Sequence, residues 1–411
     1  TDHCSFGFAS HSNIIFQINS VYQLIASRED DEQLCFLPLC HVVERLFSVE
    51  TQLATGSTVN FAESPETVFE NLQEVSPHVF FAVPRVWEKV FSRIQILRKE
   101  ATTIGRWAFD QAVDAGRAKA KYELAGEAVP AGIQMRWRVW DFLVLSNLRR
   151  MIGMDRLHRG GSGAAPISPE LLEWFWGIGV KVLEGFGQTE CSGVATINTV
   201  DQNKVGTIGI CIPGSEMRIG DGDEILMRGP HVFKGYWNKP EKTAETITED
   251  GWLRTGDVGR VDNQGFYTIT GRIKDIIITA GGKNITPAEI ESALKYSPYI
   301  SDAVIIGDQR KYLSCLIMID QENVENFAQE HSIPFSDFAS LCAAPEVREL
   351  IEKEVRTVNA QFARVEQIKE FRLIDVLLTA EDDELTPTMK LKRSFVTDKY
   401  KNLIDSMYAG A

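Results

Sequence analysis

A short polar segment that directly follows an apolar run carries side chains suited to binding a nucleotide. The apolar run covers 180–183, and the segment after it is Glu184-Gly185-Phe186-Gly187-Gln188-Thr189-Glu190. The planar ring of Phe186 can stack on a base, and the Thr189 hydroxyl can donate to a phosphate oxygen. The Glu190 carboxylate is a hard oxygen ligand of the kind that Mg²⁺ prefers. The structural alternative is a solvated loop that Glu190 merely caps.

A second segment combines glycine with other small side chains. It is Gly160-Gly161-Ser162-Gly163-Ala164-Ala165-Pro166, a loop in which a ligand can approach the backbone and bind its amides. Taken alone, such a loop is more often an ordinary turn. Both segments follow apparent strands, however, and parallel α/β sheets bind ligands at the carboxyl ends of their strands. That placement favours a ligand site.

The elements that must position these segments predict an α/β fold: a large α/β domain with a β-rich subdomain, and a small C-terminal α+β domain. Apolar runs predict strands at 34–39, 78–83 and 180–183, a helix at 13–26 and helix across most of 87–125, with breaks at Gly105 and Gly116. Short β-like runs with frequent glycine over about 206–271 predict the subdomain. The small domain is expected to contain strands at 275–278, 303–306 and 313–319, a helix capped by Thr286 and Glu289, and a helix at 345–362.

Composition restricts the class of protein. The chain has 411 residues, 44% of them hydrophobic, which predicts two or three globular domains. Its formal charge of −14 predicts no general affinity for nucleic acid or anionic membranes. Seven cysteines without a CxxC pair indicate a reducing, cytoplasmic location and no zinc site. No apolar run reaches the roughly eighteen residues of a membrane span, which leaves peripheral membrane contact open.

The stretch from Gly251 to Glu291 resembles the adenylate-forming superfamily, which includes acyl-CoA synthetases, peptide-synthetase adenylation domains and luciferases. An Asp in a glycine-punctuated turn (Asp257), a basic-acidic link (272–275) and a Gly-Gly turn before a helix stand there in the family's order. Segments 37–45, 84–89 and 345–367 resemble the long-chain fatty acyl-CoA synthetase branch. The resemblance implies a large AMP-binding domain over 1–271, a hinge at 272–275 and a mobile domain over 276–411.

The resemblance also implies roles for particular residues. Gly163, Ala164, Ala165 and Pro166 would lie against adenine, Asp257 would accept hydrogen bonds from the ribose hydroxyls, and Arg272 would lie near ribose and phosphate. Lys274 would be the hinge, and the Gly281-Gly282-Lys283 turn would contact CoA. Lys390 would stabilise charge at the α-phosphate during adenylation, and His41 would lie near the carboxyl end of the acid. Thr189 and Glu190 would serve phosphate and Mg²⁺. The expected substrates are ATP, CoA and a fatty acid.

The match to the superfamily ends near Ser10. Family members carry a glycine-rich loop with a phosphate-binding lysine just upstream, whereas residues 1–8 contain one glycine and no lysine. The chain therefore resembles a family member that is truncated or divergent at this end. Two functions follow as alternatives: a fatty acid–CoA ligase, or a non-catalytic protein that binds AMP or acyl-adenylate. An aryl acid, or a carrier protein in place of CoA, is also compatible with the sequence.

Overall fold

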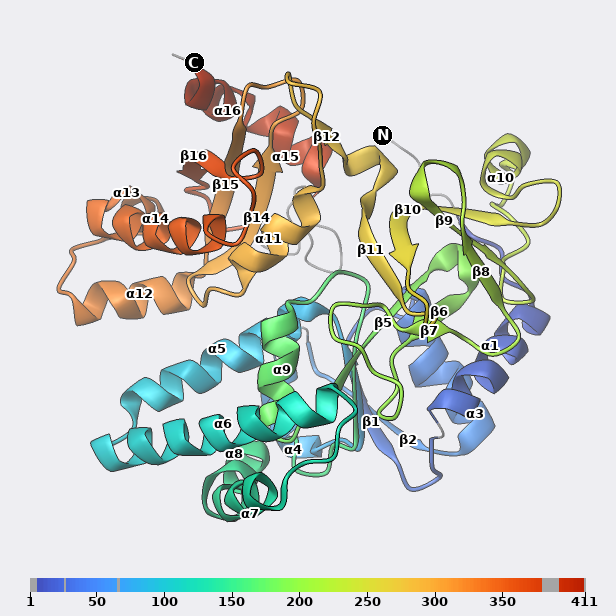
Figure 1. Ribbon diagram of the computed structural model, residues 1–411, viewed down its shortest axis with the longest axis horizontal. Helices are drawn as coiled ribbons and strands as arrows, with labels where there is room; N and C mark the ends of the chain where they lie inside the picture. The colour runs from blue at the N-terminus through green and yellow to red at the C-terminus, as the bar shows by residue number, and fades with distance from the viewer. Residues whose placement is uncertain (1–5, 26, 65–66, 379–391, 410–411) are drawn as a thin grey trace. The chain divides into compact units, whose positions relative to one another are not determined.

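The chain forms two compact units, Thr1–Ile269 and Thr270–Ala411. The computed structural model describes residues 6–25, 27–64, 67–378 and 392–409 (Figure 1). The boundary between the units lies inside the strand β11 (Tyr267–Arg272), close to the predicted domain boundary at 271. The predicted hinge at 272–275 stays a prediction.

Unit 1 is built on a seven-stranded sheet with the order β2-β1-β3-β4-β5-β6-β7. The first five strands in this order run parallel, and β6 and β7 are antiparallel to their neighbours. The strands are β1 (Glu32–Cys35), β2 (Thr58–Phe61), β3 (Val79–Ala82), β4 (Arg159–Ser162), β5 (Val182–Gln188), β6 (Gly193–Ile197) and β7 (Ile210–Cys211). The largely parallel sheet predicted from the alternating pattern is confirmed.

Helices cover both faces of this sheet, with α5, α6 and α9 on one side and α1 and α3 on the other (Figure 1). The helices of the unit are α1 (His11–Leu24), α2 (Val42–Arg45), α3 (Thr51–Thr55), α4 (Val68–Val75), α5 (Pro84–Glu100), α6 (Thr103–Leu124), α7 (Ala131–Trp140), α8 (Ser146–Met151), α9 (Pro169–Gly177) and α10 (Pro240–Thr246). Aromatic rings fill the space between the sheet and α5 and α9: Trp87 lies edge-on to Phe80 at 5.5 Å and to Phe175 at 5.1 Å. Such contacts add to the free energy of burying the rings.

Gly116 does not break the long helix, contrary to the prediction. It lies inside α6, where a Cβ atom would come within 2.1 Å of the carbonyl oxygen of Gly177 in α9. The chain breaks instead at 101–102, where Thr102 caps α6 by accepting a hydrogen bond from the Gly105 amide. Gly116 therefore permits close contact between two helices rather than a turn.

The β-rich segment forms a four-stranded antiparallel sheet with the order β11-β10-β9-β8. Its strands are β8 (Glu216–Ile219), β9 (Glu224–Arg228), β10 (Leu253–Val261) and β11 (Tyr267–Arg272). Ile225, Met227 and Leu253 are fully buried, so one face of this sheet packs into the interior and carries apolar residues. Strand β7 belongs to the larger sheet, whereas Gly209 just before it bridges to Tyr267 of β11, so the predicted start of the subdomain at about 206 stays a prediction.

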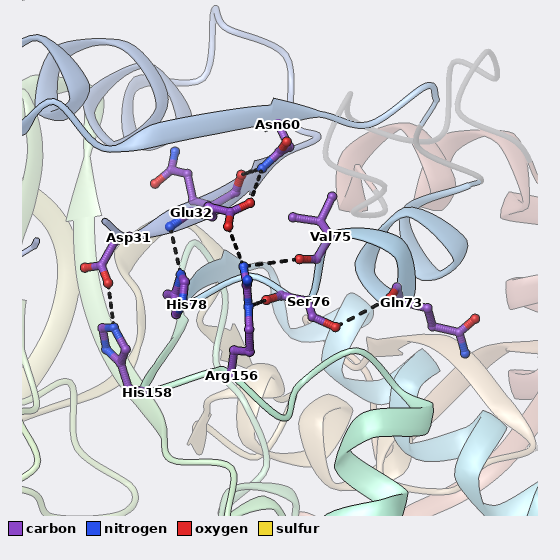
Figure 2. A network of polar contacts seen from close by, with 10 residues as sticks. Asp31, Glu32, Asn60, Gln73, Val75, Ser76, His78, Arg156 and His158 are labelled. Atoms are coloured by element: carbon purple, nitrogen blue, oxygen red, sulfur yellow. Dashed lines mark hydrogen bonds and ion pairs between the residues drawn. The ribbon is translucent and has the colours of Figure 1, made fainter. Parts of the chain in front are cut away.

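A polar network ties together the amino ends of the parallel strands (Figure 2). Just before β4, His158 Nε2 lies 2.7 Å from Asp31 Oδ1, which precedes β1. The Glu32 amide donates to His78 Nδ1 at 3.1 Å, and Arg156 forms a 2.6 Å ion pair with the Glu32 carboxylate. These contacts fix the strand ends opposite the edge that carries the glycine-bearing segments.

Unit 2 contains a three-stranded sheet with apolar residues on both faces. The order is β14-β15-β16, from β14 (Ile300–Ile306), β15 (Leu313–Ile319) and β16 (Ile368–Leu373). Alternate residues of β15 pack into two separate clusters, so Cys315 and Ile317 face one and Leu316 and Met318 face the other. The remaining elements are the hairpin β12 (Ile277–Ile278) and β13 (Asn284–Ile285), and the helices α11 (Pro287–Lys295), α12 (Gln321–Glu330), α13 (Phe338–Ala343), α14 (Pro345–Asn359), α15 (Arg393–Lys399) and α16 (Lys401–Tyr408).

The helix predicted to start at Thr286 does so, with Thr286 in the N-cap position and Pro287 first in α11. The side chain of Thr286, however, makes no capping hydrogen bond, so this part of the prediction is wrong. A Cβ atom on Gly271 would lie 2.7 Å from Thr286 Cγ2, which shows that this side chain packs against the neighbouring backbone.

Candidate nucleotide site

The two glycine-bearing segments lie side by side at the carboxyl edge of the parallel sheet. Strand β4 pairs with β5 so that Ser162 is opposite Glu184. A Cβ atom on the next residue, Gly163, would lie 3.0 Å from the carbonyl oxygen of Gly185 and 3.1 Å from the ring of Phe81. The sequence places both segments in loops, but the structure extends β4 through Ser162 and β5 through Gln188.

The chain turns sharply directly after β4. Ala164 has a φ of +67°, a left-handed conformation that is costly for a residue with a Cβ atom. Ala165 and Pro166 follow and lead to α9, whose first turn is capped by Ser168. This tight turn leaves the backbone of 163–166 without bulky side chains, as a surface against a flat ligand requires.

Glu184 is buried instead of pointing into solvent. Burial raises the pKa of its carboxyl from 4.5 to about 8, and a hydrogen bond from the Ile167 backbone offsets the increase only in part. Its carbonyl oxygen accepts hydrogen bonds from the backbone and the side chain of Asn198. The side chain is therefore mostly uncharged at neutral pH, and the segment offers its backbone and the residues farther along.

The turn Thr189–Cys191 presents the next two polar side chains. Thr189 is exposed, and Glu190 is half-buried. The Tyr236 hydroxyl donates to Glu190 Oε1 at 2.6 Å, and the Phe233 amide donates to the Glu190 carbonyl at 2.9 Å. Burial, followed by the nearby Glu190, holds the pKa of Tyr236 far above its usual value, so the phenol stays protonated and keeps donating. One carboxylate oxygen is thus held in a fixed direction.

Helix α1 contacts the turn Thr189–Cys191 through buried hydrogen bonds. The buried Gln17 side chain donates to the carbonyl oxygens of Cys191, at 2.7 Å, and Val194, at 2.6 Å. Asn13 donates to the carbonyls of Pro230 and Val232 at 2.6 and 2.9 Å. The helix therefore links the turn to the segment that carries Tyr236.

Asp257 lies in an irregular part of β10. The register between β10 and β9 shifts between Arg254 and Val258, and Gly256 has a φ of +71°. The carboxylate of Glu224 accepts a hydrogen bond from the Gly256 amide at 3.0 Å, and Thr255 Oγ1 accepts one from the Asp257 amide at 3.0 Å. The Asp257 side chain is almost fully buried. A bulge of this kind redirects a side chain out of the regular alternation of the strand.

One apolar cluster joins the strands that carry these residues. Phe186 and Tyr236 pack against buried Cys191, Met227 and Leu253. The cluster thereby connects β5 and the turn after it with β9 and β10. Leu253, its member in β10, lies four residues before Asp257. The site residues of unit 1 thus belong to one connected substructure.

His41 caps the short helix α2 without a side-chain hydrogen bond. Its Nδ1 is buried and has no hydrogen-bond partner, and burial lowers the pKa of the imidazole. A neutral imidazole with an unsatisfied nitrogen differs from the hydrogen-bonded core histidine that is the common structural alternative.

Glu190 suits a magnesium ion that is bound mainly through phosphate. Mg²⁺ is usually held by one or two carboxylates together with substrate phosphates and water. In the described part of the chain, no group of three or more His, Cys, Asp or Glu could form a metal site by itself. A single oriented carboxylate beside the exposed Thr189 hydroxyl fits the first arrangement.

The remaining candidates lie in unit 2. Arg272 ends β11 and is exposed, and Lys274 is exposed in the single turn Ile273–Asp275. The segment 281–283 forms the tight turn of the β12–β13 hairpin, in which Gly282 has a φ of +73°. The Thr279 amide donates a hydrogen bond to the Lys283 carbonyl, and the Lys283 amide donates one to Thr279 Oγ1. Lys390 lies outside the residues that the structure describes.

Sequence reasoning missed Tyr236 and Gln17, which hold the Thr189–Cys191 turn. Tyr236 is 46 residues from Glu190 and Gln17 is 174 residues from Cys191. No local spacing connects these partners, so only the tertiary structure reveals them.

Comparison with known proteins gives a consistent result. Residues 8–237 match the AMP-binding enzyme family, and residues 274–411 match the AMP-binding enzyme C-terminal domain. A Mycobacterium tuberculosis protein named as fatty-acid–CoA ligase fadD11 is 38% identical over 402 residues, which are 97% of this chain and 70% of that protein. Human long-chain-fatty-acid–CoA ligase ACSBG1 is 33% identical over 414 residues, covering 93% of this chain and 56% of its own length.

A solved structure shows the same fold. The adenylation domain of a carboxylate reductase from Mycobacterium chelonae has a TM-score of 0.72 and 22% identity, and the match covers 98% of this chain and 59% of that one. The predicted fold class and the family resemblance are thereby confirmed. With a family match over more than half of its length and a 38% identical relative of which it covers 70%, the chain belongs to the AMP-binding enzyme family, in the fatty acyl-CoA synthetase branch of the adenylate-forming superfamily.

Proposed function

We propose that the chain is an AMP-forming ligase that joins a long-chain fatty acid to CoA at the expense of ATP. The main structural support is the turn after β5, where Tyr236 holds the Glu190 carboxylate next to the exposed Thr189. The turn follows β5, whose Gly185 lies next to Gly163 at the carboxyl edge of a parallel sheet, the edge at which such sheets bind ligands. The names of the relatives support a fatty acid as the substrate.

In the first half-reaction, a carboxylate oxygen of the fatty acid attacks the α-phosphorus of ATP. The bond between the α-phosphorus and its bridging oxygen breaks, and pyrophosphate leaves. Phe186 would stack on the base, Asp257 would accept the ribose hydroxyls, and Arg272 and Thr189 would donate to phosphate oxygens. Lys390 would stabilise the charge at the α-phosphate, as the family resemblance implies.

Glu190 would hold Mg²⁺ together with the phosphates of ATP. The ion would supply positive charge that neutralises the departing pyrophosphate. The hydrogen bond from Tyr236 orients the carboxylate through Oε1, and Oε2 would be the oxygen that binds the ion. His41, neutral because of burial, would contact the carboxyl end of the acid without adding charge.

In the second half-reaction, the CoA sulfur attacks the carbonyl carbon of the acyl-adenylate. The bond from this carbon to the phosphate oxygen breaks, AMP leaves, and the thiol proton is released. The Gly281-Gly282-Lys283 turn would line the pantetheine arm, because glycine leaves the backbone open to a thin ligand. Lys274 would serve as the hinge between the two half-reactions, as the family resemblance implies.

The test is fatty-acid-dependent exchange of labelled pyrophosphate into ATP. We expect exchange with one or more saturated acids of C8 to C20, and acyl-CoA formation once CoA is added. Asp257→Ala should abolish exchange, whereas Asp262→Ala, in the exposed turn of the same sheet, should not. No exchange by wild type with any of these acids would contradict the proposal.

One observation favours a second function, a non-catalytic protein that binds AMP or acyl-adenylate. The segment upstream of α1 uses its backbone to pair with 234–237: Phe8 donates to Gly235 at 2.8 Å, and Trp237 donates to Phe6 at 2.9 Å. The Phe8 amide is therefore already engaged with 234–237, which leaves it unable to donate to the outer phosphates of ATP. Calorimetry separates the two functions, since AMP binding without exchange, and without discrimination between AMP and ATP, favours the second.

A further inference from the structure

An apolar face flanked by arginines runs along one continuous helical segment of unit 1. Residues 131–151 form α7, a π-helical turn (Asp141–Leu145) and α8 without interruption. Leu145 and Leu148 point inward and are buried, whereas four large apolar side chains on the other side are exposed. These are Met135, Val139, Phe142 and Leu143, of which Phe142 is 80% exposed. We call this set the apolar stripe.

The apolar stripe continues onto the start of α6. Trp107 lies edge-on to Trp140 of α7 at 5.8 Å, and Ile104 is one turn away from Trp107. Both Ile104 and Trp107 are exposed, at 78% and 58%. Isolated exposed apolar residues are common on protein surfaces, but six large ones on two helices that pack together mark an interaction surface.

The charges around the stripe are positive although the whole protein is acidic. Residues 131–151 contain four arginines and one aspartate, in a chain of net charge −14. Arg136, Arg138 and Arg150 are exposed beside the stripe, while Asp141 is held by Arg149 at 2.7 Å. On α6, Asp110 is held by Arg98 at 2.6 Å. The exposed Asp114, two turns beyond Trp107, limits the surface on that side.

We propose that this face docks onto an anionic lipid surface, with the apolar stripe inserted and the arginines at the level of the phosphate groups. An interfacial helix has this arrangement of large apolar and tryptophan side chains on one face with arginines along its borders. The long arginine side chains can reach the headgroups while their stems cover apolar surface. The described helices include none that is long and apolar enough to cross a membrane.

The charge pattern argues against a second copy of the chain as the occupant. A two-fold contact would bring the same face of both copies together and place Arg136 and Arg138 near their equivalents. The region offers few free carboxylates to compensate, because Asp110 and Asp141 are already paired. An anionic lipid headgroup supplies the missing negative charge without this repulsion.

Vesicle flotation with the 411-residue chain tests the proposal, without ATP, fatty acid or CoA, so that its failure is separate from failure of the proposed activity. We expect binding to vesicles of phosphatidylglycerol and phosphatidylcholine, much weaker binding to phosphatidylcholine alone, and loss of affinity with rising salt. Phe142→Glu should lower the partition coefficient by about tenfold or more, since it removes a buried ring. The matched control is Phe61→Glu, at an exposed phenylalanine on β2.

A second pair of variants tests the arginines. Arg136→Glu with Arg138→Glu should reduce binding to the anionic vesicles, whereas Lys353→Glu with Arg364→Glu, at exposed positions of unit 2 and with the same change in charge, should not. Circular dichroism should show both folded. Equal binding by the Phe142→Glu and Phe61→Glu variants, or no binding by wild type, would overturn the proposal. So would a wild-type dimer in sedimentation that Phe142→Glu makes monomeric, because a second copy would then cover this face.

Discussion

Replacing the buried Glu184 by glutamine should remove a specific loss of stability at alkaline pH. In the folded chain, burial raises the pKa of this carboxyl from 4.5 to about 8. Between these values the folded state keeps the proton and the unfolded state releases it, so the free energy of unfolding falls as the pH rises. Glutamine resembles the protonated acid in shape, and its oxygen can still accept the hydrogen bond from the Ile167 amide.

The size of the effect follows from the difference in pKa. Each unit of pKa difference corresponds to ~1.4 kcal/mol, so the free energy of unfolding of wild type should fall by about 4 kcal/mol between pH 5 and pH 8 because of this carboxyl. The Glu184→Gln variant lacks this contribution. It should be about as stable as wild type at pH 5 and about 4 kcal/mol more stable at pH 8.

Urea unfolding followed by tryptophan fluorescence at pH 5, 6, 7 and 8 measures this difference. All eight tryptophans lie between positions 87 and 252, so the signal reports unit 1, which contains Glu184. Glu241→Gln, on the exposed start of α10, is the control and should follow wild type at every pH. If the Glu184→Gln and wild-type curves stay parallel from pH 5 to pH 8, the carboxyl is not neutral in the folded chain and the reasoning fails.

Three further substitutions test the packing and the site. Gly116→Ala should lower the free energy of unfolding by about 1–3 kcal/mol in the same urea assay, because its Cβ would meet the Gly177 carbonyl, while Gly132→Ala in α7, with open space around it, should be neutral or stabilising. Tyr236→Phe should raise the KM for Mg-ATP in pyrophosphate exchange by about tenfold, because it removes a hydrogen bond to the Glu190 carboxylate; an unchanged KM would exclude the positioning role. Asp257→Asn should weaken AMP binding about tenfold by calorimetry if the carboxylate accepts the ribose hydroxyls, and equal affinities would exclude that role.

Local sequence patterns predicted the element types where each element is stabilised by its own periodicity. Strands β14 and β15 are clear in the sequence as short apolar runs, and helix α14 is clear because its apolar residues recur on one face. Strand β16 is not predicted from the sequence. The sequence instead predicts a loop at Gly160 and Gly161. They form part of β4 because pairing with β3 and β5, and a hydrogen bond from the Trp87 indole to the Gly161 carbonyl at 3.2 Å, outweigh the low strand propensity of glycine.

In the candidate site, too, local motifs predict some features and only the tertiary structure determines others. The sequence points to Phe186, Thr189 and Glu190 because they follow one strand in a compact motif, and to Asp257 through the resemblance of its segment to the adenylate-forming superfamily. It does not reveal that Glu184, from the same motif, is buried, because burial depends on how α9 and β6 close around β5. The direction of the Glu190 carboxylate is also set from far away, by Tyr236.

Tyr236 connects stability with the proposed chemistry. Its ring packs edge-on to Phe233 at 5.0 Å and belongs to the apolar cluster that also contains Phe186, while its hydroxyl orients Glu190. The ring of Tyr236 packs against this cluster, and the ammonium group of Lys242 lies 4.7 Å from the ring centre. The position of the carboxylate is therefore determined by core packing rather than by a mobile loop, as a site that must hold a charged ligand in one geometry requires.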